Sequence, residues 1–237
     1  EVSSLPPLAL ELERELELLQ GDDFDVAGLE SELDKAREDY LFSARELSLK
    51  RQQTAASLSE QITQVMQQLG MENGRFVIDI DSTQEPSANG IDTIRYLVST
   101  NPGQTPRTLA KTASGGELSR ISLAIQVIMS ESSRIPTLIF DEVDAGVGGG
   151  VAEIVGKKLR LLGHARQVLC VTHLPQVASQ AHHHYRVEKT SVDDDTTTAV
   201  SLLDEAERLE EIARMLGGVK ITEQSRAHAS EMIASRD

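Results

Sequence analysis

Residues 136–173 read PTLIFDEVDAGVGGGVAEIVGKKLRLLGHARQVLCVTH. The segment begins with an apolar run at 136–140 and ends with a second one at 167–172, and a helical pattern from about 151 to 162 separates them. A strand, a helix and a strand in this order predict a parallel βαβ unit with both strands buried. The sequence therefore predicts an α/β fold.

Polar residues directly follow both predicted strands. Asp141 and Glu142 come after the first strand, and His173 comes after the second. Ligands in open α/β sheets bind beyond the carboxyl ends of the strands, so these three residues are candidates for a site. Taken singly, each is typical of a solvated strand end, and the argument for a site rests on their combination with the motif upstream.

That motif is TASGGELSR, residues 112–120. Ser114 and Glu117 have the spacing of a capping box at a helix start, and apolar residues mark one face of the predicted helix up to residue 130. Gly115 and Gly116 each cost about 0.5–1 kcal/mol relative to alanine in a helix. Two glycines in the first turn therefore predict that another molecule comes very close to this backbone.

The first 70 residues have a helical pattern. Apolar residues from Leu33 to Leu69 recur at spacings of three and four, which predicts one helix of about 40 residues and about 60 Å. A narrow apolar seam on so long a helix predicts a coiled coil with a partner helix, and a helix in a bundle is the alternative. Further strands and helices are predicted at 75–80, 93–98, 185–188, 197–202, 204–216 and 222–235, with a turn at 193–195.

The composition narrows the class of protein. The 237 residues carry a net charge of −15, which argues against a broadly basic nucleic-acid surface. The single cysteine, Cys170, excludes an internal disulfide framework, and no apolar run approaches the length of a membrane span. The chain does not begin with methionine, so we expect it to be a fragment.

The motifs and their order resemble those of the ATP-binding-cassette ATPases. Ala113-Ser-Gly-Gly-Glu117 looks like the signature motif of that family, Leu138-Ile-Phe-Asp-Glu142 like its Walker B strand, Asp144 like the D-loop aspartate and His173 like the switch histidine. Within the family, residues 113–120, 141–147, 171–178 and 206–218 are most similar to the SMC-like ATPases of bacterial DNA repair. This resemblance implies a head lobe over 71–237, with a mixed sheet and flanking helices, and a coiled-coil segment over 1–70.

The resemblance also implies roles for the candidate residues. Asp141 would help to hold Mg²⁺, through water, Glu142 would polarise the attacking water, and His173 would contact the γ-phosphate of ATP. The start of the signature helix would face ATP held by a second head, through Ser114, Gly115, Gly116 and Glu117. Asp144 would lie across the dimer seam. In such proteins two heads close on ATP and open on hydrolysis during double-strand break repair and recombination in the bacterial cytoplasm, at the nucleoid.

One family motif is missing from the sequence. A complete head needs Gly-x-x-x-x-Gly-Lys-Ser/Thr to cradle the phosphates. The only Gly-Lys pair is Gly156-Lys157, with Val151 at the position of the first glycine. We therefore expect the C-terminal half of a head, inactive alone and completed by an N-terminal half, with DNA bound by other regions or a local patch and no membrane contact.

Two functions of different classes remain open. The first is the catalytic half of an ATP-driven DNA-repair ATPase, which the Asp141-Glu142 pair favours. The second is a structural tether whose heads bind ATP without significant hydrolysis, which the long coil favours equally. A transporter ATPase is a weaker third possibility, because nothing in the sequence indicates docking to a membrane protein. His182, His183 and His184 are interpreted as a solvated strand entry, and Cys170 as a small buried hydrophobe.

Overall fold

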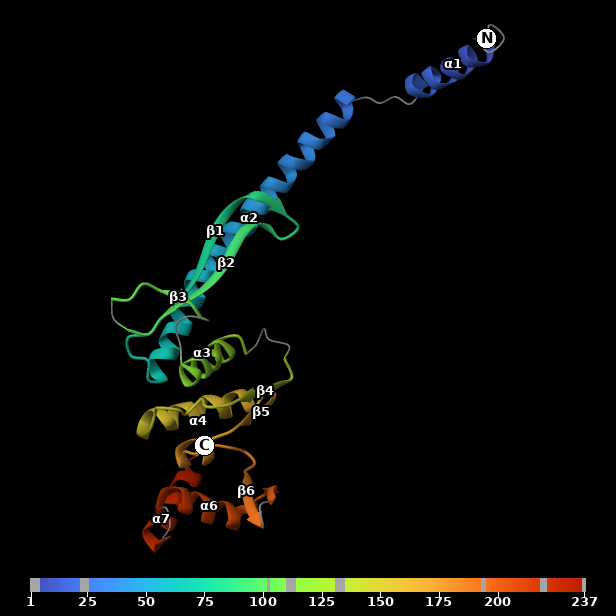
Figure 1. The fold of residues 1–237 in the computed structure, drawn as a ribbon. Coiled ribbons are helices and arrows are strands. Elements are labelled where there is room, and N and C mark those ends of the chain that lie inside the picture. The colour runs from blue at the N-terminus through green and yellow to red at the C-terminus, as the bar shows by residue number, and fades with distance from the viewer. Residues whose placement is uncertain are drawn as a thin grey trace. The chain divides into compact units, whose positions relative to one another are not determined.

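The structure is a computed structural model that describes residues 5–21, 26–101, 103–109, 114–130, 135–192, 195–217 and 221–235. Its elements are α1 (Leu5–Gly21), α2 (Val26–Gln68), β1 (Arg75–Ser87), β2 (Gly90–Ser99), β3 (Arg107–Thr108), α3 (Gly115–Ile128), β4 (Thr137–Phe140), α4 (Gly149–Gly163), β5 (Gln167–Cys170), α5 (Pro175–Ala178), β6 (Tyr185–Val192), β7 (Asp195–Leu202), α6 (Glu205–Gly217) and α7 (Glu223–Ala234) (Figure 1). The predicted helices and strands are confirmed, most of them within a few residues of their expected ends.

Two compact units divide the chain. The first unit comprises Glu1–Arg51 and Ser82–Thr93, and the second comprises Gln52–Asp81 and Ile94–Asp237. The proposed boundary at residue 70, between a coiled coil and a head, is not tested by this division and stays a prediction. No helix among the described residues is both long and apolar enough to cross a membrane.

In the first unit, the turn between β1 and β2 lies against α2. The Asp92 carboxylate is fully buried and accepts hydrogen bonds from Ser48 Oγ at 2.7 Å and Arg51 Nη1 at 3.0 Å. The Tyr40 hydroxyl donates to the Ser87 carbonyl at 3.1 Å. The hairpin therefore covers part of the helix seam that the sequence assigned to a partner helix.

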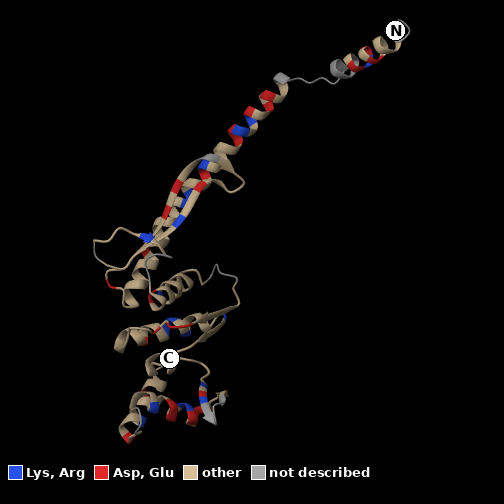
Figure 2. Cartoon of the chain, in the orientation of Figure 1, with Lys and Arg blue, Asp and Glu red and all other residues tan. Residues whose placement is uncertain are grey.

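Closer to its N-terminus, the described part of α2 is exposed. Leu29 and Leu33 are 56% and 68% exposed, and acidic and basic residues follow one another along the same helix (Figure 2). Apolar side chains spaced along a charged helix are typical of a coiled-coil surface. A partner helix at this place stays a prediction.

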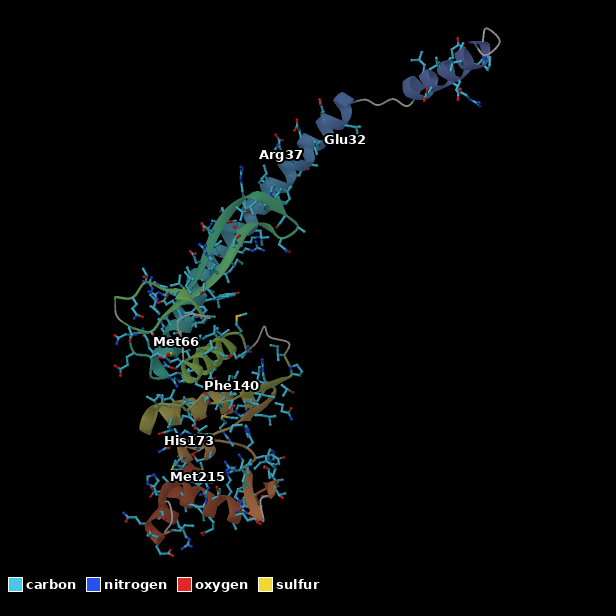
Figure 3. All side chains as sticks on the ribbon, viewed as in Figure 1. Glu32, Arg37, Met66, Phe140, His173 and Met215 are labelled. Atoms are coloured by element: carbon cyan, nitrogen blue, oxygen red, sulfur yellow. The ribbon has the colours of Figure 1, made fainter. Side chains whose placement is uncertain are left out.

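In the second unit, one hydrophobic core joins α2 to the elements around β4. Its fully buried members include Met66 from α2, Leu69 directly after α2, Phe76 from β1, Ile121 from α3 and Val155 from α4. Figure 3 labels Met66 and Phe140, which both belong to this core. The first residues of β1 are also bonded to side chains of α2, because Thr63 Oγ1 accepts the Phe76 N–H and Ser59 Oγ accepts the Ile78 N–H.

The predicted βαβ unit is present. β4 and β5 pair in parallel with the register Thr137↔Gln167 to Phe140↔Cys170, and α4 connects them. Leu138, Phe140, Val168 and Cys170 face the core. Because both strands run the same way, the residues that follow them emerge at one edge of the sheet, as the sequence predicted.

The prediction that both strands are buried on both faces is wrong. Ile139 is 70% exposed, Leu169 is 45% exposed and Val171 is 64% exposed. Alternate residues of a strand point to opposite faces, and among the described residues helices pack on only one face of this two-stranded sheet. The described part of the chain therefore leaves an apolar sheet face uncovered.

The C-terminal part forms a hairpin and two helices. β6 and β7 pair antiparallel, from Tyr185↔Leu202 to Val192↔Asp195, and the first two residues of the predicted turn at 193–195 lie outside the described residues. A capping box at Thr222 starts α7, which packs on α6 through Ile212, Ala213 and Ala229. The side chains of His182 and His183 are exposed, as expected for a solvated strand entry, but His184 is half-buried, so the interpretation is wrong for this residue.

Candidate functional site

The start of α3 is one side of the site. Ser114 Oγ accepts the Glu117 N–H at 3.4 Å, and Glu117 Oε2 accepts the Ser114 N–H at 3.0 Å. This reciprocal pair is the capping box that the sequence predicted. Ala113, the first residue of the predicted signature motif, lies outside the described residues.

The two glycines of α3 pack against the chain's own loop after β4. A Cβ on Gly115 would lie 2.6 Å from Glu142 Oε2. A Cβ on Gly116 would lie 2.9 Å from the Ala145 Cβ and 3.1 Å from the carbonyl oxygens of both Glu142 and Ala145. The approach of another molecule stays a prediction, and in this structure the atoms close to both glycines belong to residues 142–145 of the same chain.

The two acidic residues after β4 differ in their hydrogen bonds and backbone conformation. Asp141 Oδ1 accepts the Glu142 N–H at 2.9 Å, and the Asp141 carbonyl accepts a hydrogen bond from Ser119 Oγ at 2.7 Å. Glu142 has φ +55°, a left-handed conformation that costs about 1–3 kcal/mol for a non-glycine residue. The side chains of Asp141 and Glu142 are both exposed, so both carboxylates are available at the carboxyl edge of the sheet.

The position of the Glu142 carboxylate has an electrostatic consequence. It lies beside Gly115 at the first turn of α3, where unpaired backbone N–H groups and the helix dipole create positive potential. An anion is stabilised at such a place by about 0.3–1 kcal/mol when it is exposed. The start of α3 is therefore suited to a carboxylate or a phosphate.

Asp144 joins the two loops that follow the parallel strands. Its carboxylate is only 2% exposed and accepts hydrogen bonds from Thr172 Oγ1 at 2.5 Å and from the His173 N–H at 3.2 Å. His173 Nδ1 lies 3.4 Å from the same carboxylate oxygen, while the His173 side chain is 73% exposed. The predicted position of Asp144 across a dimer seam stays a prediction, because here its side chain is buried within its own chain.

The sequence-predicted residues thus fall into two contacting groups. Gly115 and Glu142 meet at the start of α3, and Asp144 and His173 meet beyond β4 and β5. Residues 141–145 belong to both groups and connect them. Figure 3 labels His173, beyond the end of β5.

Three residues of this site were not predicted from the sequence. Ser119 and Arg120 both bond to carbonyls of residues 141–145, and Thr172 bonds to Asp144. Ser119 and Arg120 lie three and four residues after Gly116, which places all three on one helix face. That spacing was visible in the sequence, but its significance depends on what packs against the face.

Burial also affects the thiol near the site. Burial raises the pKa of Cys170 to about 12, and the nearby carboxylates of Asp144 and Asp141 act in the same direction. The thiol therefore stays protonated at neutral pH and is no nucleophile. This outcome agrees with the interpretation of Cys170 as a small hydrophobe.

The exposed Asp141 carboxylate is of the ligand type that Mg²⁺ prefers, and the start of α3 suits a phosphate. The carboxylates of Asp141 and Glu142 therefore fit the magnesium ion of a nucleotide, and the start of α3 separately fits a phosphate. One nucleotide does not fit between them, because the Glu142 carboxylate lies against Gly115. These residues provide no second cradle for phosphates, since the sequence lacks the Gly-Lys-Ser/Thr loop.

Comparison with known proteins identifies the relatives of this chain. No family model matches it. It is 47% identical to "DNA repair protein RecN" of Xylella fastidiosa (strain 9a5c) over 221 residues, which is 92% of this chain and 40% of that protein. The chain matches the C-terminal part of RecN. The RecN of Haemophilus influenzae is 51% identical over 84% of this chain, and that of Bacillus subtilis is 36% identical over 100% of this chain.

The RecN relatives are longer than this chain, which spans 36% of the Haemophilus protein and 44% of the Bacillus protein. Among solved structures, an Smc head domain with an extended coiled coil from Pyrococcus furiosus matches with a TM-score of 0.51 and 17% identity. The match covers 90% of this chain and 55% of that one. It confirms the predicted fold class, an SMC-type head lobe of mixed α/β structure.

Proposed function

We propose that this chain is the C-terminal part of an ATP-hydrolysing head of a RecN-type protein that acts in DNA double-strand break repair and recombination. The observation that carries the proposal is the loop at residues 141–145. It presents two exposed carboxylates beside the start of α3 and is joined through Asp144 to His173. The similarity to RecN over most of the chain supports the repair function.

The proposal gives each side chain a role. Asp141 helps to hold Mg²⁺ through water, Glu142 polarises the attacking water, and His173 orients the terminal phosphate. Bound MgATP would supply the terminal phosphate that is transferred to water, and its Mg²⁺ would neutralise part of the charge of the phosphates. The chain's contribution is positioning and electrostatic stabilisation, which are the main terms in phosphoryl transfer.

The proposal also assigns the start of α3 to a second head. Ser114, Gly115, Gly116 and Glu117 would face the nucleotide of that head, with Asp144 near the seam. In this structure the Glu142 carboxylate already lies beside Gly115. Closing of the heads would therefore require the Glu142 side chain to turn away from α3, toward the nucleotide of its own head.

The missing half of the head is proposed to cover the open face of the β4–β5 sheet. Ile139, Leu169 and Val171 expose apolar surface there, and burying an apolar side chain contributes about 1.5–3 kcal/mol. The same half would bring the absent phosphate-binding loop. In this scheme residues 1–70 are the coiled-coil segment and 71–237 the C-terminal half of the head. DNA binds elsewhere or at a local patch, because the net charge of −15 repels it.

The test is ATPase activity of this chain mixed with a separately prepared N-terminal half. We expect turnover in the mixture, none with this chain alone, and loss of turnover with Glu142→Gln while ATP now traps a dimer of heads. Glu153→Gln is the matched control, because Glu153 pairs with Lys157 on the surface of α4. Its turnover should equal that of the wild type.

The same experiment discriminates the alternatives. If the halves associate and bind ATP but neither wild type nor variant hydrolyses it, the chain is part of a tether and the ATPase proposal is wrong. If Glu142→Gln hydrolyses ATP at the wild-type rate, Glu142 does not polarise the water.

A further inference from the structure

Three residues on one face of α3 contact the loop at residues 141–145. Gly116 packs on Ala145, Ser119 Oγ donates to the Asp141 carbonyl at 2.7 Å, and Arg120 Nη1 donates to the Ala145 carbonyl at 2.7 Å. The Arg120 side chain crosses between segments 25 residues apart in the sequence and is buried, with 6% of the residue exposed.

A charged guanidinium group, such as that of Arg120, is unusual at a buried position between two segments. Burial lowers the pKa of Arg120, and the charge of Glu117, one helix turn earlier, opposes this shift only in part. Among the described residues, no carboxylate forms a salt bridge with Arg120, and its Nε has no hydrogen-bond partner. A buried charge without a directly bonded counter-charge is a poor source of stability, and an apolar side chain of similar volume would fill the space at lower cost.

The carbonyl that Arg120 binds closes a tight turn. The Ala145 N–H donates to the Glu142 carbonyl at 3.0 Å, so residues 142–145 form one turn that carries both Glu142 and Asp144. Glu142 holds its left-handed φ within this turn. A backbone in such a conformation persists only where its surroundings fix it, and Arg120 is a side chain that fixes the last residue of the turn.

We propose that Arg120 is a positioning residue for ATP hydrolysis, which holds the turn at residues 142–145 on α3 so that Glu142 and Asp144 keep a fixed place relative to the signature helix. This inference rests on the proposed function. It deepens that function by making α3 and the loop after β4 one rigid body. Whatever contacts the start of α3 then acts directly on Glu142, and through Asp144 on His173.

The structural part of the inference is tested on this chain alone by amide hydrogen exchange. Arg120→Met keeps the volume and removes the donor, and Arg120→Lys keeps a charge and one donor group. We expect the Ala145 amide to exchange about tenfold faster in Arg120→Met, as for the loss of one hydrogen bond, with Arg120→Lys in between.

Arg166 offers a matched control. Arg166 is a half-buried arginine, and its Nη2 donates to the Ser130 carbonyl just beyond the other end of α3. Arg166→Met should leave the exchange of the Ala145 amide unchanged. Equal acceleration in both variants would mean general loosening of the unit and would overturn the inference.

The functional part uses the chain assembled with its N-terminal half. Arg120→Met should lower kcat about tenfold or more while KM for ATP changes less than about twofold, because the residue acts on the geometry of Glu142 and not on nucleotide binding. Arg120→Lys should restore part of the loss, and Arg166→Met should match the wild type.

The outcomes separate the two proposals. If the wild-type assembly hydrolyses ATP and Arg120→Met keeps its kcat, the positioning role is wrong and the proposed function stands. If KM rises with kcat unchanged, Arg120 serves nucleotide binding and the positioning role is again wrong. If the wild-type assembly does not hydrolyse ATP, the proposed function fails, and the inference fails with it.

Discussion

Alanine substitutions at Gly115 and Gly116 should have opposite effects on stability, although the two residues are neighbours in the same helix turn. Neither glycine has a positive φ, so alanine fits the backbone at both positions. Alanine also restricts the unfolded chain, which stabilises the folded state by about 0.4–1 kcal/mol at a compatible site. The difference therefore comes from what the added Cβ meets.

At Gly116 the added Cβ meets backbone. It would lie 3.1 Å from the carbonyl oxygens of Glu142 and Ala145 and 2.9 Å from the Ala145 Cβ, and none of these atoms can turn aside. Overpacking of this kind costs about 1–3 kcal/mol, which exceeds the gain from the unfolded state. We expect Gly116→Ala to lose about 1–2 kcal/mol, or a fall of about 2–8 °C in Tm for a chain of this size.

At Gly115 the added Cβ meets only the end of the Glu142 side chain, at 2.6 Å from Oε2. That carboxylate is exposed and can rotate, so Gly115→Ala should be as stable as the wild type or more stable by about 0.4–1 kcal/mol. Urea unfolding of both variants, followed by circular dichroism, measures the difference. Equal midpoints, or a more stable Gly116→Ala, would refute the packing of α3 on residues 142–145.

Three further predictions concern stability and reactivity. Asp92→Ala should destabilise the chain by about 1–3 kcal/mol in urea unfolding, because it leaves Arg51 and Ser48 without their buried acceptor, whereas Asp79→Ala, at the exposed pair with Arg95, should change little. Cys170 should react at pH 8 on the order of a hundredfold more slowly in the folded than in the unfolded chain, and since its native pKa of about 12 exceeds the ordinary 9.0, its contribution to stability should decline as pH rises from 9.0 toward 12. Burial lowers the pKa of His184 below 6.5; the charge of Arg208 acts in the same direction, and that of Glu211 opposes it. Because the native state favours the neutral ring, stability should fall as the pH drops through 6.5. This fall should be less steep in His184→Gln. A steeper or unchanged slope in His184→Gln would contradict this assignment.

The local features of the site could be predicted because they depend on residues within one or two helix turns. The capping box at Ser114 and Glu117 is of this kind. The parallel pairing of β4 with β5 joins residues 30 positions apart, and it was predicted from the order strand, helix, strand. Hydrophobic periodicity reports which face of an element is apolar, and cap residues report where a helix begins. Neither signal reports what packs against that face.

The prediction for the sheet failed for this reason. Continuous apolar runs at 136–140 and 167–172 indicated strands buried on both faces, yet Ile139 and Leu169 are exposed. The described part of this chain supplies helices for only one face of the sheet, so the apolar side chains on the other face stay exposed. The sequence shows that both faces of the strands are apolar, but it does not show which segment packs on each face.

The sequence by itself determined the order of the elements, the α/β class, the helix start at Ser114 and the place of Asp141, Glu142 and His173 beyond the strands. Only the tertiary structure decided that Gly116 packs against the chain's own Ala145, that Arg120 holds the same residue, and that Asp144 is buried under Thr172. These contacts join residues 25 to 29 positions apart. Their formation depends on how the whole core positions α3 and the two loops, and no local sequence signal carries that information.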